Sequence, residues 1–141
     1  MKLTVLGCGP SGGVPLIGHI WGNCEPANPK NRRRRASLLI EDGQHTILID
    51  SSPDLRLQLL DANVSWLDAI LYTHSHSDHA HGIDELRPIF FINQRGPIPI
   101  YGSKETIADL ESRFHYLFSI AQDEGYPKLY PKILESHIIE G

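Results

Sequence analysis

The sequence has no long hydrophobic run, little cysteine and no excess of positive charge. No apolar stretch approaches the roughly 18 residues of a membrane span, and residues 1–7 are too short for a signal peptide, so no membrane partner is expected. Cys8 and Cys24 are too few for a disulfide scaffold, which favours the reducing cytoplasm. The 13 Lys and Arg against 17 Asp and Glu give a net charge of −4. This balance argues against a nucleic-acid partner.

The residues that are present fit one globular domain. The chain has 141 residues, of which 40% are hydrophobic and 21% are charged. These proportions exclude a disordered chain or a fibre, and the length leaves room for a single core. Histidine is the unusual component. There are 8 histidines, and His74, His76, His79 and His81 fall within one short segment.

The hydrophobic pattern predicts alternating strands and helices in a mixed α/β order. Residues 36–40 and 45–49 are rich in β-forming side chains and flank Asp42-Gly43, which is typical of a hairpin turn. Ser52 is expected to cap a helix at its N-terminus. That helix has an apolar face formed by Leu55, Leu59, Leu60 and Val64. The other expected elements are a strand at 2–6, an irregular loop at 16–31, a strand at 69–72, a helix from 78 or 79 that ends before Pro88, a strand at 98–101, a helix at 103–120, and one or two strands at 128–140.

The segment Gly7-Cys8-Gly9-Pro10-Ser11-Gly12 matches the glycine fingerprint of dinucleotide-binding folds. That fingerprint works only when a helix follows it and offers free N–H groups to the pyrophosphate. Gly13, Pro15 and Gly18 argue against such a helix. We therefore interpret the segment as a tight turn at which the backbone passes close to a neighbouring segment.

The histidine segment predicts a transition-metal site. His74 and His76 are two residues apart at the end of an apolar strand, so both side chains point to one side. Asp78 and His79 follow where the chain turns into a helix and can face the same space. Imidazole and carboxylate together suit Zn²⁺, Mn²⁺ or Fe better than Ca²⁺ or Mg²⁺. The alternative is that the histidines lie on the surface and Asp78 only caps the helix.

The order His74-x-His76-x-Asp78-His79 resembles the signature of the metallo-β-lactamase superfamily. Residues Gly9–Pro15, Ile49-Asp50, Thr73, Gly82 and Leu86-Arg87 are similar to the PhnP-like phosphodiesterase branch, which is related to the tRNA-processing ribonuclease Z group. The resemblance implies an αβ/βα sandwich, of which residues 1–141 would form the N-terminal part, the first sheet with its helices.

The resemblance also implies the roles of the site residues. His74 and His76 would help to hold one Zn²⁺ or Mn²⁺ ion, and Asp78 and His79 the other. A bridging hydroxide would attack a phosphodiester, and Asp50 would support the site beside the catalytic Asp78. The implied substrate is a small phosphodiester such as a nucleotide-like or cyclic phosphate.

Two departures from the family pattern limit what the resemblance implies. The loop after Pro15 keeps only Cys24 where relatives often carry a zinc-binding cysteine cluster. The family's remaining ligands belong to a second half that does not follow here, so each metal would have two protein ligands. We therefore expect weak or single-metal occupancy, little hydrolysis by this chain alone, and self-association through an uncovered apolar sheet face. His115 and His137 are not expected to replace the missing ligands.

Two alternative functions accompany the main one. The chain could be a truncated, non-catalytic metal-binding or interaction module. The run Arg32–Arg35 is expected to be the solvated start of a strand, in which only two of the four residues face one surface. The alternatives are a phosphate-facing pair near the metal loop and a nucleic-acid site. Cys8 has no neighbouring base that would make it a nucleophile, and Ser51 and Ser52 are expected to act as capping residues. Phe114, Tyr116 and Phe118 are expected in the core.

Overall fold

The computed structural model describes residues 1–93, 96–118 and 129–134. Within these residues, six strands form one sheet in the order β1-β2-β3-β4-β5-β6. The strands are β1 (Lys2–Gly7), β2 (Ser37–Glu41), β3 (Thr46–Ile49), β4 (Ala69–Leu71), β5 (Ile98–Gly102) and β6 (Leu129–Ile133). Strand order therefore follows chain order throughout the sheet.

The sheet is antiparallel at one end and parallel at the other. β1 to β3 pair antiparallel, and β3 to β6 pair parallel. The predicted hairpin of β2 and β3 is confirmed. Oδ1 of Asp42 accepts the N–H groups of Gln44 at 2.8 Å and His45 at 2.7 Å, and Gly43 adopts the left-handed φ of 95° that the turn needs.

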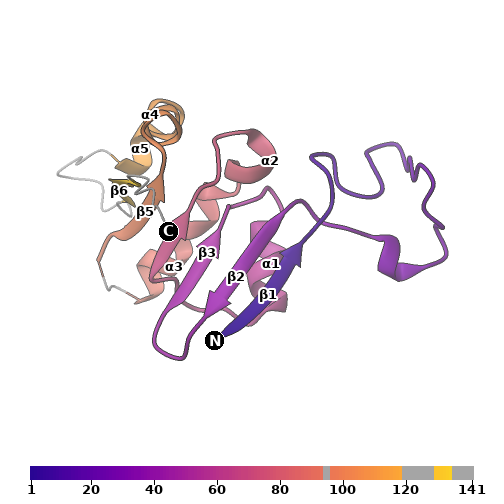
Figure 1. Ribbon diagram of the computed structural model, residues 1–141, viewed down its shortest axis with the longest axis horizontal. Helices are drawn as coiled ribbons and strands as arrows, with labels where there is room; N and C mark the ends of the chain where they lie inside the picture. The colour runs from indigo at the N-terminus through magenta and orange to yellow at the C-terminus, as the bar shows by residue number, and fades with distance from the viewer. Residues whose placement is uncertain (94–95, 119–128, 135–141) are drawn as a thin grey trace, which may run out of the picture.

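Helices connect the parallel strands and cover one face of the sheet. They are α1 (Leu55–Asp61), α2 (Ser77–Ala80), α3 (Leu86–Asn93), α4 (Lys104–Arg113) and α5 (His115–Phe118), with 3₁₀ turns η1 (Pro29–Asn31) and η2 (Ile83–Glu85). In Figure 1, α1 and α3 lie behind the sheet, α2 sits at its upper edge, and the connection from β1 to β2 extends to the right.

The core lies between the sheet and these helices. Leu39, Leu48, Ile70 and Ile100 are paired across β2 to β5 and are 1% exposed or less, and they pack with apolar residues of α1, α3 and α4. The residues next to them along each strand point to the opposite face, which is more exposed. The described part of the sheet is thus covered on one side.

Several predicted helix limits are wrong. Helix α1 begins at Leu55, not at Ser52, because the Ser52 hydroxyl accepts the Asp54 N–H at 3.2 Å and donates to the Gln58 side chain at 2.9 Å. Pro88 lies in the first turn of α3, where a missing N–H costs nothing. The predicted helix over 103–120 is divided at Phe114, whose ψ of 34° leaves the helical region.

Other limits agree with the structure or lie beyond it. Ser103 caps α4 as predicted, and its hydroxyl accepts the Thr106 N–H at 3.2 Å. The tail contributes β6, while residues 135–141, including His137, lie outside the described residues. No helix in the described ranges has the length and apolar character needed to cross a membrane.

Candidate metal centre

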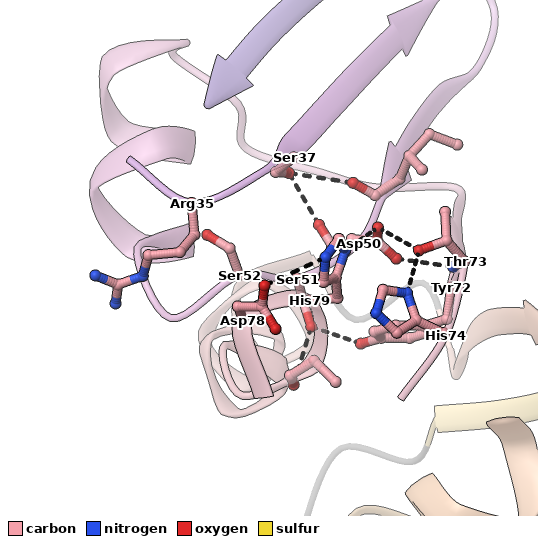
Figure 2. A network of polar contacts seen from close by, with 12 residues as sticks. Arg35, Ser37, Asp50, Ser51, Ser52, Tyr72, Thr73, His74, Asp78 and His79 are labelled. Carbon is pink, nitrogen blue, oxygen red and sulfur yellow. Dashed lines mark hydrogen bonds and ion pairs between the residues drawn. The ribbon is translucent and has the colours of Figure 1, made fainter. Parts of the chain in front are cut away.

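The predicted site residues come from three elements that end at one edge of the sheet. Asp50 follows β3, Thr73 and His74 follow β4, and Asp78 and His79 lie in α2. Because β3 and β4 run parallel, their carboxyl ends open into the same space. Figure 2 shows the His79 ring next to Asp50 and the His74 ring next to Thr73.

Asp50 is the centre of this network. Its side chain is buried and accepts three hydrogen bonds, from the Thr73 N–H at 2.8 Å, the Thr73 hydroxyl at 2.7 Å and Nδ1 of His79 at 2.7 Å. Its backbone adopts a φ of 59°, a left-handed conformation in which Asp is tolerated better than most residues. This bend after β3 directs the carboxylate toward α2.

The hydrogen bonds fix which imidazole nitrogens are free. The single hydroxyl proton of Thr73 goes to Asp50, so the Thr73 oxygen can only accept from Nδ1 of His74, 3.0 Å away. Nδ1 of His79 must likewise donate to the Asp50 carboxylate. In their neutral forms, both rings therefore present an unprotonated Nε2. Metal-binding histidines are typically oriented in this way, by a carboxylate or hydroxyl that holds the other nitrogen.

The donor atoms lie close together at the start of α2. Nε2 of His79 is 3.4 Å from Oδ2 of Asp78, the spacing of about 3.4 Å expected for two ligands of a tetrahedral zinc at roughly 2.1 Å each. The His74 ring centroid lies 4.1 Å from that of His79 and 4.8 Å from that of His76. The structure thus brings the four predicted residues together, while their role as metal ligands stays a prediction.

The donor set fits a divalent transition metal in its chemistry but is incomplete in number. Among the residues that the structure describes, no three His, Cys, Asp or Glu side chains form a group that could hold one ion. His81 points elsewhere, since its ring packs edge-on against Phe114 at 5.7 Å. Each ion would draw at most two ligands from the described part of this cluster, and the assignment of ligands to two ions stays a prediction.

Helix α4 holds the histidine loop in place, a feature that the sequence analysis missed. Arg113 donates to the carbonyl of Ser75 and pairs with Asp109. A hydrogen bond with the Ser75 hydroxyl, and to a smaller extent one with Arg113, lowers the pKa of the Asp109 carboxyl. No local pattern reveals this contact, because Ser75 and Arg113 are 38 positions apart.

Comparison with known proteins gives this geometry a family. Residues 45–137 match the family described as "Beta-lactamase superfamily domain". The chain belongs to the metallo-β-lactamase superfamily. Its fold also superposes on a solved diphosphatase of the PhnP family with a TM-score of 0.79 and 33% identity, over 94% of this chain and 50% of that one. The resemblance to the PhnP-like branch is therefore confirmed.

Two further proteins are similar to nearly the whole of this chain. A protein named octanoyltransferase from Porphyromonas gingivalis is 38% identical over 92% of this chain and 26% of its own length. The structure of Zn²⁺-bound PqqB from Methylobacterium extorquens has a TM-score of 0.67 at 20% identity, over 95% of this chain and 46% of that one, and shows the fold alone. The chain thus spans about a quarter of the first and about half of the second.

Within this superfamily fold, the glycine fingerprint has a structural role, as the sequence analysis expects. No helix follows it within residues 8–28. A Cβ at Gly7 would lie 2.0 Å from the Arg35 carbonyl oxygen, and one at Gly9 would lie 2.8 Å from that of Arg34. The glycines therefore let β1 and its loop pack directly against the arginine segment.

Several other predicted roles are corrected. Ser51 is not a cap, because its hydroxyl donates to the Ala80 carbonyl at 3.2 Å and contacts the buried Tyr72 hydroxyl at 2.7 Å. Burial raises the pKa of that Tyr72 hydroxyl. Phe114 and Phe118 pack against the core as predicted. Tyr116 does not, since it is 38% exposed and donates to Asp84 at 2.8 Å. Its partial burial beside that carboxylate raises its pKa to about 12.

The arginine run also differs from its prediction. All four residues of Arg32–Arg35 line the same cavity, whereas the prediction placed two of them on each side of a strand. The segment forms only isolated bridges, of Arg33 with Val14 and of Arg35 with Gly9. Without a continuous strand, strict alternation of side chains does not apply.

Proposed function

We propose that this chain carries part of the active site of a metal-dependent phosphodiesterase that acts on small phosphodiesters. The observation that supports it best is the shared use of Asp50, which orients His79 directly and His74 through Thr73. Such an arrangement serves ligands that must present Nε2 to an ion. The PhnP-family neighbour, a diphosphatase by its description, supports phosphate ester chemistry.

His74, His76, Asp78 and His79 would hold Zn²⁺ or Mn²⁺. A bound ion of this kind supplies Lewis-acid activation of water and neutralises charge at phosphorus. The protein's own residues orient the imidazoles, keep Asp50 and Tyr72 out of bulk water, and fix the turn from β4 into α2. The octanoyltransferase name belongs to a protein of which this chain matches about a quarter, so no acyl transfer is proposed.

Metal binding and turnover are measured separately on the 141-residue chain. Calorimetric titration with Zn²⁺ should show saturable binding that His76→Ala and Asp78→Ala weaken by at least about 100-fold. Added Zn²⁺ or Mn²⁺ should raise hydrolysis of a bis-aryl phosphodiester above that of the metal alone, and the same variants should abolish the increase. The exposed His115 lies outside the cluster, so His115→Ala should change neither.

The results decide between a phosphodiesterase and a non-catalytic metal-binding module. Metal binding with no turnover above that of the metal alone would favour the non-catalytic metal-binding module for this chain. Full turnover in Asp78→Ala would remove the cluster from the mechanism.

A further inference from the structure

The arginine run and the glycine loop line a cavity, open to solvent, that the proposed chemistry does not use. Its volume is about 560 Å³, within the range of roughly 300–1,000 Å³ that is typical of small-molecule sites. We call it the arginine cavity. Its charged lining consists of Lys30, Arg32, Arg33, Arg34, Arg35 and Asp54.

This lining is strongly positive although the chain as a whole is negative. The lining contains five cationic side chains and one carboxylate, whereas the net charge of the protein is −4. Two of the arginines have acidic partners. Nε of Arg35 is 3.2 Å from Asp54, and Arg34 is 2.7 Å from the exposed Asp61. The Arg35–Asp54 pair is structural, because Asp54 also accepts the backbone N–H of Arg35 at 2.9 Å.

The remaining cations have no carboxylate partner within the described ranges. Arg33 instead donates to the sulfur of Cys8 at 2.9 Å, a weak acceptor. Arg32 lies over the ring of Trp21, with its guanidinium carbon 5.0 Å from the ring centroid. Both arginines are exposed and therefore keep N–H donors for an anion. Several guanidinium groups around one concave space match a phosphate, which accepts several charge-assisted hydrogen bonds.

The cavity wall is connected to the metal centre through β2. Arg35 is two positions before Ser37, whose hydroxyl contacts the carbonyl oxygens of Asp50 at 2.9 Å and Ile49 at 3.2 Å. Figure 2 shows Arg35 and Ser37 at the same edge of the sheet as Asp50. The arginine cavity and the candidate metal ligands therefore lie on segments that β2 and β3 join.

We propose that the arginine cavity binds a phosphate group of a small phosphorylated ligand. Resting on the proposed function, this ligand is the substrate itself, and the bound phosphate is one that is not cleaved. A long nucleic acid is the less suitable occupant, because the rest of a protein with net charge −4 repels an extended polyanion.

The test is calorimetric titration of the 141-residue chain with inorganic pyrophosphate in excess EDTA, which removes any metal contribution. We expect saturable binding of one pyrophosphate per chain. Arg33→Gln or Arg32→Gln should raise Kd by about tenfold or more, the loss expected for one charged hydrogen bond. Arg56→Gln is the matched control, since Arg56 is exposed on α1 and does not line the cavity.

Two further arms decide the location and the kind of ligand. His76→Ala should keep full pyrophosphate binding, a result that holds even if the phosphodiesterase proposal fails. Loss of binding in His76→Ala would place the anion at the histidines and overturn the inference. Equal Kd values for Arg33→Gln and Arg56→Gln, at unchanged melting temperature, would also overturn the inference. A single-stranded oligonucleotide that binds more tightly than pyrophosphate, with a steep salt dependence, would reject the small-ligand site.

Discussion

Asp50 shows how one carboxylate prepares two imidazoles. It accepts from Nδ1 of His79 and, through the Thr73 hydroxyl, determines the proton on Nδ1 of His74. The side chain is 4% exposed, so water does not compete for these hydrogen bonds. The sequence alone suggests a supporting role for Asp50, but not that Thr73 relays it to His74.

Replacing this carboxylate should weaken metal binding without removing a ligand. Asp50→Asn offers an amide that cannot accept all three hydrogen bonds, so His79 loses its fixed orientation. We expect Zn²⁺ affinity to fall by about 10–100-fold, the usual cost of losing such a partner. Calorimetric titration measures this, with Asp61→Asn on the far end of α1 as the control. An unchanged affinity would show that Asp50 does not orient His79.

Gly82 is a second residue on which the site depends. Its N–H donates to the Ser51 carbonyl at 2.8 Å, which fastens the end of α2 to the segment after β3. An added Cβ would lie 2.0 Å from the Ser52 carbonyl oxygen, although the backbone φ of −89° suits any residue. The need for glycine here is therefore purely steric.

Gly82→Ala should destabilise the protein by about 3 kcal/mol, because backbone must move to make room. Gly22→Ala is the comparison, since a Cβ there meets nothing within 4 Å and only the φ of 57° opposes it. We expect a cost of about 1 kcal/mol for Gly22→Ala. Urea denaturation measures both, and equal costs would contradict the steric account.

At the scale of elements, α4 acts as a clamp on the loop that carries the histidines. Arg113 and Asp109 reach back to Ser75, the residue between His74 and His76. The loop itself makes no regular secondary structure. Its position therefore depends on a helix that follows it in the chain by about thirty residues.

The pH dependence of this contact follows from the lowered pKa of Asp109. Stabilisation by the Ser75 hydroxyl is complete above the ordinary value of 3.8 and is lost as the pH falls through the lower, folded-state value. The Ser75 amide resonance should thus shift below pH 4, as Asp109 takes up its proton. Asp109→Asn should remove that shift, whereas Asp61→Asn should keep it. A shift that persists in Asp109→Asn would assign the titration to another group.

The elements differ in how well the sequence predicts them. The strands agree because short apolar runs bounded by Asp-Gly or Gly-Pro leave few alternatives. Helix ends depend on neighbours. Pro88 continues into α3 because η2 precedes it and places it in a first turn. The break at Phe114 accompanies its packing against the core, and no local residue announces it.

At the scale of the molecule, one face of the described sheet has no helical cover. Two rows of paired side chains run across it, Leu3-Ile40-Ile47-Ala69 and Val5-Leu38-Ile49-Leu71-Tyr101. Leu3 is 57% exposed and Val5 is 66% exposed. In its PhnP-family neighbour, the matching part is half of the chain.

We expect two copies of the chain to associate through this face, because contiguous exposed apolar surface favours burial. Sedimentation should show a dimer that Val5→Glu dissociates, with Kd rising by at least about tenfold. Leu60→Glu is the control, since Leu60 is 61% exposed but lies on α1. A monomer at millimolar concentration, or equal effects of both variants, would contradict this expectation.

The connection from β1 to β2 affects the order of assembly. Among the described strands, β1 has β2 as its single neighbour, and residues 8–36 between them contain no α-helix to shorten the path. Closing a long, irregular loop costs entropy before the strand contacts repay it. β1 should therefore dock late in folding and detach early in unfolding. β1, its glycine loop and the arginines jointly form the arginine cavity, so that cavity exists only in the fully folded chain. A ligand bound there would therefore stabilise the docked position of the edge strand β1.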